Sequence, residues 1–186
     1  MIVEIGTSDF RTLAGIEDGL FIEPVKPYFD RLPDCRKENI AISNRVGEIH
    51  IFYLEPEDIE KLGLPNWARG CNSVNKPHPT IEKLLFNRVG VLGKDYIKSS
   101  VVKVDRIANV LRRHKIDKFR ELKIDTEGHD SVILNDYLDT VDFRPSVIKF
   151  EDNGLTHRKE IQKIVRRLQN AGYKVRKIGT DMIAKK

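Results

Sequence analysis

The chain has 186 residues, of which 40% are hydrophobic and 33% are charged. This length suits one domain, and the composition is typical of a globular protein rather than a disordered one. No apolar run approaches the roughly 20 residues that a membrane span requires, so we expect no membrane partner. Cys35 and Cys71 match no metal-ligand spacing and form no disulfide framework, which favours a reducing, cytoplasmic location.

Positive charge is concentrated near the end of the chain. The net charge is +5, but residues 156–186 carry ten Lys or Arg against Glu160 and Asp181, which gives +8 there and −3 elsewhere. A basic face attracts nucleic acid or anionic lipid. Nucleic-acid sites also present aromatic platforms, however, and only Tyr173 interrupts this run. We therefore favour a solvated helix face over a nucleic-acid site.

Five short apolar runs predict strands that are buried on both faces, as a parallel sheet requires. Helical patterns lie between several of them. The clearest helix covers residues 156–171, where Thr156 can cap the start and Gly172 can close the end, and Pro27 suits the first turn of a shorter helix. The five apolar runs cover residues 2–5, 20–23, 39–43, 121–125 and 146–151.

This alternation predicts an α/β fold with an open, doubly wound, mostly parallel sheet and right-handed crossovers. Residues 173–178 and 181–184 follow the last helix and are joined by a two-residue link, so they must pair as a C-terminal antiparallel hairpin. Gly47 similarly allows residues 48–54 to turn back beside 39–43.

The segment 55–79 fits neither the helical nor the strand period. We expect a single domain over residues 1–186 in which this segment is an inserted loop. Long ordered loops are often lids or binding loops, and a solvent-exposed insertion is an equally good interpretation. As a mobile lid over an acceptor pocket, the segment would be anchored by Trp67, and Asn72, Ser73 and Asn75 would offer hydrogen bonds.

A glycine-containing turn closes the first strand, in Val3-Glu4-Ile5-Gly6-Thr7-Ser8-Asp9. Gly6 permits a tight turn and a close approach of a ligand to the backbone. The acid at Glu4 can accept hydrogen bonds from loop amides or meet an ammonium group. Because open α/β sheets bind ligands beyond the carboxyl ends of their central strands, the candidate ligand-binding residues here are Glu4, Gly6, Thr7 and Ser8.

A second carboxylate stands at the tip of the second strand, where Glu23 is followed by Pro24. A carboxylate at this place can accept hydrogen bonds from both hydroxyls of a ribose, as in nucleoside-binding sheets of this kind. The apolar residues before Glu23 need no acid for folding. We therefore favour ribose binding over a surface carboxylate.

A third group of polar residues follows the strand at 121–125, in Asp125-Thr126-Glu127-Gly128-His129-Asp130. Asp125 and Glu127 are too polar to be buried unpaired, so they should face a cleft or a partner. Capping of the next helix, at 131–138, by Asp130 explains part of this pattern. It does not explain the acid at the end of the strand.

These motifs resemble those of the FkbM family of methyltransferases. The run Ile124-Asp125-Thr126-Glu127-Gly128 is similar to the family's Asp-x-Glu-Gly motif, and residues 144–151 resemble its next strand. Val3-Glu4-Ile5-Gly6 matches the opening motif, and Glu23-Pro24 matches an acid-Pro ribose motif. The four matches occur in order over residues 3–151, and the ribbon at 47–54 also fits.

The resemblance implies a Rossmann-like class I methyltransferase fold and an enzyme that uses S-adenosylmethionine. It implies that Glu4, Gly6, Thr7, Ser8, Glu23 and Asp125 bind this cofactor. The reaction would be an SN2 transfer of a sulfonium methyl to an acceptor oxygen, in which the protein aligns the reactants and excludes water. Asp125 is the first candidate for the catalytic neighbourhood, and Glu127 and His129 follow it, with Glu151 and His78 after them.

A metal ion is not expected. Asp125, Glu127 and Glu151 offer oxygen ligands, but no complete ligand set for a hard cation is visible. The sequence also departs from the family pattern, because Phe10 stands where a further glycine usually follows Gly6, and relatives usually carry leading elements that cover the site. An open pocket, the 55–79 segment or a second subunit in a homo-oligomer would then take their place.

The acceptor expected from the resemblance is a hydroxyl on a small molecule, with a sugar as one candidate. The basic C-terminal segment keeps a nucleic-acid methyltransferase as an alternative. A third alternative is a nucleoside-binding domain without catalysis, since a fold does not by itself decide function.

Overall fold

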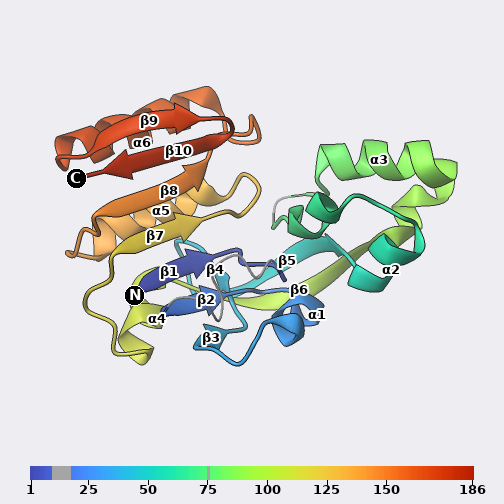
Figure 1. The fold of residues 1–186 in the computed structure, drawn as a ribbon, viewed down its shortest axis with the longest axis horizontal. Coiled ribbons are helices and arrows are strands. Elements are labelled where there is room, and N and C mark those ends of the chain that lie inside the picture. Colours follow the sequence, from blue (N-terminus) through green and yellow to red (C-terminus); the bar gives the residue numbers. More distant parts are fainter. Residues whose placement is uncertain (10–17, 75) are drawn as a thin grey trace.

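The computed structural model describes residues 1–9, 18–74 and 76–186 and forms two sheets with helices around them (Figure 1). The main sheet has seven strands in the order β3-β2-β1-β7-β8-β10-β9. Phe10 and Asn75 lie outside the described residues. The strands of the main sheet, from one edge to the other, are Lys37–Glu38 (β3), Gly19–Ile22 (β2), Ile2–Ile5 (β1), Glu121–Ile124 (β7), Val147–Glu151 (β8), Asp181–Lys185 (β10) and Lys174–Ile178 (β9).

The centre of the main sheet is parallel, as the apolar runs predicted. Strand β1 pairs in parallel with β2 on one side and with β7 on the other, and β7 pairs in parallel with β8. The hairpin of β9 and β10 closes the sheet, with β10 antiparallel to β8. The prediction that the strands at 2–5 and 121–125 are neighbours is therefore confirmed. Their carboxyl ends meet at one edge, where a doubly wound sheet binds its ligand.

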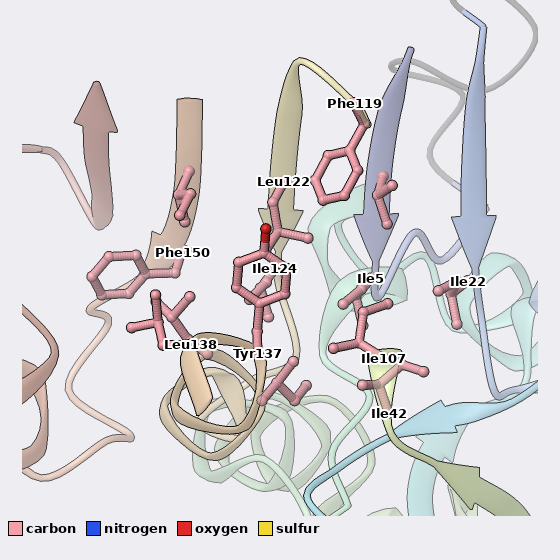
Figure 2. Packing of buried hydrophobic residues seen from close by; sticks show 14 of the residues in the cluster. Ile5, Ile22, Ile42, Ile107, Phe119, Leu122, Ile124, Tyr137, Leu138 and Phe150 are labelled. Atoms are coloured by element: carbon pink, nitrogen blue, oxygen red, sulfur yellow. The ribbon is translucent and has the colours of Figure 1, made fainter. Parts of the chain in front are cut away.

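One face of the main sheet carries the core. Because side chains alternate across a strand, Ile5, Leu122 and Ile124 point to the same face and pack against helices α4 (Ile107–Arg113), α5 (Asp130–Thr140) and α6 (Arg158–Asn170). Figure 2 shows Ile107 and Tyr137 directed toward these strands. This packing fixes the position of the loops that follow β1 and β7.

The expected strand at 39–43 is wrong as a member of the parallel core. The third strand of the main sheet is β3, and the next residues form β4 (Ala41–Ile42), which pairs with β6 (Ile97–Asp105) in a second sheet of order β4-β6-β5. The β6 strand was missed because most of its residues are polar or partly exposed. Strand β5 (Gly47–Leu54) exists as predicted, but it pairs with β6 and does not lie beside 39–43.

The segment 55–79 is structured. It contains α2 (Pro56–Lys61) and the short helix η1 (Asn66–Gly70), and α3 (Pro79–Val89) and η2 (Gly90–Tyr96) follow. Figure 1 shows α2 and α3 beyond the ends of β5 and β6, away from the main sheet. Trp67 is 46% exposed, so its predicted role as apolar anchor is wrong. The buried residues here are Leu54, Ile59, Ala68, Ile81 and Leu85.

One helix end differs from the sequence interpretation. Helix α6 is capped by His157, whose side chain accepts a hydrogen bond from the amide of Lys159, and Thr156 instead contacts the carbonyl oxygen of Gly128. Helix α1 (Lys26–Arg31) has Pro27 in its first turn, as predicted.

Among the residues described, no helix has the length and apolar character that crossing a membrane requires. The cytoplasmic location and the single-domain assignment stay predictions.

Replacing Gly6 with alanine should destabilise the fold strongly. Gly6 has a φ of +81°, and a Cβ atom there would lie 1.8 Å from the carbonyl oxygen of Asp125. We expect a loss of roughly 2–4 kcal/mol in the free energy of unfolding, measured by chemical denaturation. Gly172→Ala is the control, because Gly172 has a φ of +88° but no atom near its Cβ position. Equal losses in the two variants would contradict the steric argument.

Candidate functional site

A pocket opens at the carboxyl ends of β1, β2 and β7. It is bounded by the loops after these strands, by β4 and β5, and by the residues that follow η1. One part of its wall is polar and another part is apolar. The polar side chains are those of Ser8, Glu23, Asn72, Asp125, Thr126 and His129. The apolar wall consists of Ile40, Ala41, Ile42, Ile51 and Val74, with Ile5 and Pro24 beside it.

Glu23 lies in the pocket wall and is only 2% exposed. Its Oε2 accepts a hydrogen bond from the amide of Ser8 at 2.6 Å, and its Oε1 accepts one from the amide of Val25 at 2.8 Å. Burial raises the pKa of Glu23 to about 7, although these two hydrogen bonds oppose the shift. Each carboxylate oxygen keeps a second lone pair, so the group can still accept hydrogen bonds from a ligand.

The loop after β1 is held in place by Ser8. This residue has a φ of +51°, its amide binds Glu23, and its hydroxyl donates to the carbonyl oxygen of Arg69 at 2.7 Å. The loop is thereby tied both to β2 and to η1. Gly6 and Ser8 border the pocket, whereas Thr7 is buried and is not part of the pocket wall. A role of Thr7 toward a ligand stays a prediction.

Glu4 is buried behind the pocket and is paired with Lys123, its neighbour across β1 and β7. The Nζ atom of Lys123 lies 2.7 Å from Oε1 of Glu4 and 3.7 Å from Oδ2 of Asp125. Of the two interactions that the sequence allowed for Glu4, with loop amides or with an ammonium group, the structure shows the ammonium. Glu4 therefore orients Lys123 beside Asp125, and its predicted contact with a ligand is not tested.

Asp125 borders the pocket directly after β7, with its side chain 38% exposed. Burial raises its pKa to about 6, Lys123 lowers it, and the carboxylates of Glu127 and Glu4 raise it further. No hydrogen bond ties its side chain to another described residue. Asp125 thus faces a cleft, as the sequence predicted, and its contact with a ligand stays a prediction.

Three carboxylates gather beyond the ends of β7 and β8. One oxygen atom each of Asp125, Glu127 and Glu151 lies within 4.8 Å of the others, and we call this group the carboxylate cluster. Burial raises the pKa of Glu151, and the negative charges of the neighbouring carboxylates raise it further, to about 8. The side-chain nitrogen (Nδ2) of Asn153 donates to the carboxylate of Glu127 at 2.9 Å and to that of Glu151 at 2.6 Å. Like charges at this spacing cannot all ionise freely at neutral pH.

Glu127 has more partners than the other members of the cluster. Its Oε2 lies 3.1 Å from Nε2 of His78, and its carbonyl oxygen accepts a hydrogen bond from Ser73 at 3.4 Å. The backbone of Glu127 has a φ of +51°, an unfavourable conformation for a non-glycine residue. His78 and Ser73 belong to the segment 55–79, so Glu127 fastens that segment to the loop after β7.

His129 and Asp130 have separate surroundings although they are adjacent in the chain. His129 borders the pocket, and its Nε2 lies 3.0 Å from the hydroxyl of Ser43. Asp130 is fully buried and accepts hydrogen bonds from the amides of Thr126 and Glu151, at 2.9 and 2.8 Å. The interpretation of Asp130 as a helix cap is wrong, because it lies in the first turn of α5 and joins the ends of β7 and β8.

Sequence reasoning missed the apolar wall and the position of Arg69. The wall comes from residues 40–42, from β5 and from Val74. The sequence predicted the first two only as strands and did not indicate that they line a pocket. Arg69 forms ion pairs with Asp9 at 2.7 Å and with Glu60 at 2.9 Å, which fix η1 over the loop after β1. No local motif marks these contacts, since they join segments that are far apart in the sequence.

The chain is similar to known proteins over most of its length. The family model of the methyltransferase FkbM domain matches residues 6–175. A crystal structure at 2.20 Å resolution of the methyltransferase FkbM from Methylobacillus flagellatus KT matches with a TM-score of 0.57 and 12% sequence identity. The match covers 100% of this chain and 43% of that protein, so the chain spans less than half of its length. No curated protein matches the chain.

Proposed function

Because the chain belongs to the FkbM methyltransferase family, we propose that it binds S-adenosylmethionine in this pocket and methylates a hydroxyl group of a small molecule. A sugar is one candidate acceptor. The observation that carries the proposal is the buried carboxylate of Glu23 beside an apolar wall, at the carboxyl ends of the central strands. Ligands of open α/β sheets bind at this position.

The residues of the pocket fit an adenosine ligand. Glu23 offers lone pairs for the two hydroxyls of a ribose, and the apolar wall suits a flat heterocycle. Ser8, Thr126 and Asn72 provide polar groups around the remaining part. The Oδ1 atom of Asn72 is buried and has no hydrogen-bond partner among the described residues, although Asn72 lines the pocket. A buried acceptor of this kind favours a ligand that donates a hydrogen bond.

When bound, S-adenosylmethionine supplies an electrophilic methyl group on a good leaving group. The chain must then hold the acceptor in line, exclude water and take up the hydroxyl proton. We assign proton uptake to Asp125, because Asp125 borders the pocket, its carboxylate is tied to no other side chain of the described residues by a hydrogen bond, and it has Lys123 within 3.7 Å.

The carboxylate cluster divides acid and base roles between its members. With a pKa near 6, Asp125 is ionised at neutral pH, whereas Glu151, with a pKa near 8, keeps its proton. Neighbouring carboxyl groups with separated pKa values are the usual arrangement for such a division. Glu127 is a positioning residue in this scheme, since His78 and Asn153 already engage its carboxylate.

Calorimetry with S-adenosylhomocysteine, followed by a turnover assay on a library of hydroxylated acceptors, tests the proposal. We expect one binding site per chain and methyl transfer to at least one acceptor. Binding without turnover would support the alternative of a non-catalytic nucleoside-binding domain. Turnover on RNA with a steep loss of affinity at high salt would support a nucleic-acid acceptor. Failure to bind the nucleoside at all would contradict both the cofactor and the reaction.

A further inference from the structure

His129 has one ring nitrogen engaged by the protein and one that is not. Its Nε2 lies 3.0 Å from Oγ of Ser43, which is itself 2% exposed. No hydrogen bond joins Nδ1 to any of the residues that the structure describes, and His129 is one of the residues that line the pocket. The imidazole is therefore engaged at Nε2, whereas Nδ1 has no hydrogen-bond partner among the described residues.

The contacts of Ser43 favour the tautomer of His129 that carries its proton on Nε2. Both contacts of Ser43 can be hydrogen bonds only if its hydroxyl donates to Oδ1 of Asn44 at 3.3 Å and its oxygen accepts from Nε2–H of His129 at 3.0 Å. Burial and the charge of Arg45 lower the pKa of His129, which keeps the ring neutral at pH 7. A neutral ring with its proton on Nε2 has a lone pair on Nδ1. That nitrogen can accept a hydrogen bond but cannot donate one.

The pocket that His129 lines suits the base of a nucleoside. The apolar wall can pack against a flat ring. His129 lines the same pocket and stands at the N-terminal end of α5. A lone pair beside an apolar slot selects a ring that carries an N–H donor at its edge. Adenine has such a donor in its exocyclic amino group, whereas hypoxanthine carries a carbonyl oxygen at the same position.

We propose that His129 recognises the exocyclic amino group of an adenine base through Nδ1, and that Ser43 sets the tautomer that makes this recognition selective. The inference rests on the proposed function, which places a nucleoside in this pocket. It gives His129 a role in ligand selection in place of the catalytic role expected from the sequence. A base with a carbonyl oxygen at this position would bring two lone pairs together and bind more weakly.

The test compares S-adenosylhomocysteine with S-inosylhomocysteine, which differs by having a carbonyl oxygen in place of the amino group. Dissociation constants are measured by calorimetry at pH 7.5, which requires no catalytic turnover. We expect the wild-type protein to prefer the adenosyl compound by about tenfold or more, because one hydrogen bond is lost and a repulsion is added. His129→Leu should reduce the preference to within about threefold.

Two further variants separate recognition from a structural role. His129→Asn keeps an acceptor oxygen near the position of Nδ1 and should retain most of the preference. Ser43→Ala keeps the ring but removes the acceptor for Nε2–H, so either tautomer can form and the preference should fall severalfold. A merely structural role of His129 would weaken both nucleosides equally in every variant. Thermal denaturation of each variant confirms that it is folded.

Equal affinity of the wild-type protein for the two nucleosides would overturn the inference, and so would an undiminished preference in His129→Leu. If His129→Leu does not fold, the opposite expectations for His129→Asn and Ser43→Ala still decide the matter. Failure of the proposed function gives a different result, because the wild-type protein would then bind neither nucleoside.

Discussion

Replacing Asp125 with asparagine is expected to lower kcat for methyl transfer to a hydroxyl acceptor by about 10²–10⁴-fold, the usual contribution of a general base. Asparagine has nearly the same size and can still bind a ligand, but it cannot take up a proton at neutral pH. The loss in kcat should therefore far exceed any loss in affinity for S-adenosylhomocysteine. Steady-state kinetics and calorimetry on the same preparation measure the two effects.

The pH dependence of the wild-type reaction gives an independent check. Burial raises the pKa of Asp125 to about 6, so the active ionised form is lost as the pH falls through 6, and kcat should fall with it. Glu127→Gln removes a neighbouring carboxylate that raises the pKa of Asp125, so this limb of the profile should move to lower pH. If the profile is unchanged both in Asp125→Asn and in the variant of the neighbouring carboxylate, Asp125 is not the base.

The central strands of this fold could be predicted because the sequence pattern that indicates each of them lies within a few consecutive residues. Residues 2–5 and 121–125 are short apolar runs that end in a polar, glycine-containing turn, and such a pattern has few alternatives to a buried parallel strand. Their pairing followed from the topology of doubly wound sheets. Glu23 and Asp125 could be placed at the same edge of the sheet for the same reason.

The second sheet could not be predicted in this way. Strand β6 mixes charged, polar and apolar residues with little burial, so its period is weak. It pairs with β5 (Leu54 with Ile97) and with β4 (Ala41 with Val104), which are distant in the sequence. The role of Trp67 was wrong because composition indicates burial only on average. In the short helix η1, Ala68 faces the core and Trp67 is largely exposed.

The carboxylate cluster shows the same limit at the level of single side chains. The motif around Asp125 indicated an acidic site, but the engagement of Glu127 by His78, and of Glu4 by Lys123, depends on tertiary contacts. Only those contacts distinguish the carboxylate that is free for chemistry from the carboxylates that hold the loops.

Glu23→Ala is expected to reduce the affinity for S-adenosylhomocysteine by roughly 2–3 kcal/mol, because a ribose loses hydrogen bonds to a charged acceptor. The same change leaves the amides of Ser8 and Val25 without their acceptor, so the variant should also unfold at a lower temperature. Calorimetry measures the affinity, and thermal denaturation shows whether the protein is folded during that measurement. Glu38→Ala is the control, since Glu38 ends the neighbouring strand β3 but pairs with Arg113 outside the pocket.

The titration of Glu23 distinguishes a direct contact with the ligand from a structural effect. Its pKa in the folded chain is raised by burial to about 7, so the free protein binds a proton there that the unfolded chain has lost above its ordinary pKa of 4.5. This contribution to stability is complete below pH 4.5 and is lost as the pH rises through 7. A ribose that donates hydrogen bonds to Glu23 favours the ionised form, so affinity should rise with pH through 7 and binding below that pH should release a proton. Calorimetry in two buffers of different ionisation enthalpy detects this proton in the wild-type protein. If the Glu23→Ala protein releases the same proton, the carboxylate of Glu23 does not contact the ribose, and the ligand must be held by other groups of the pocket.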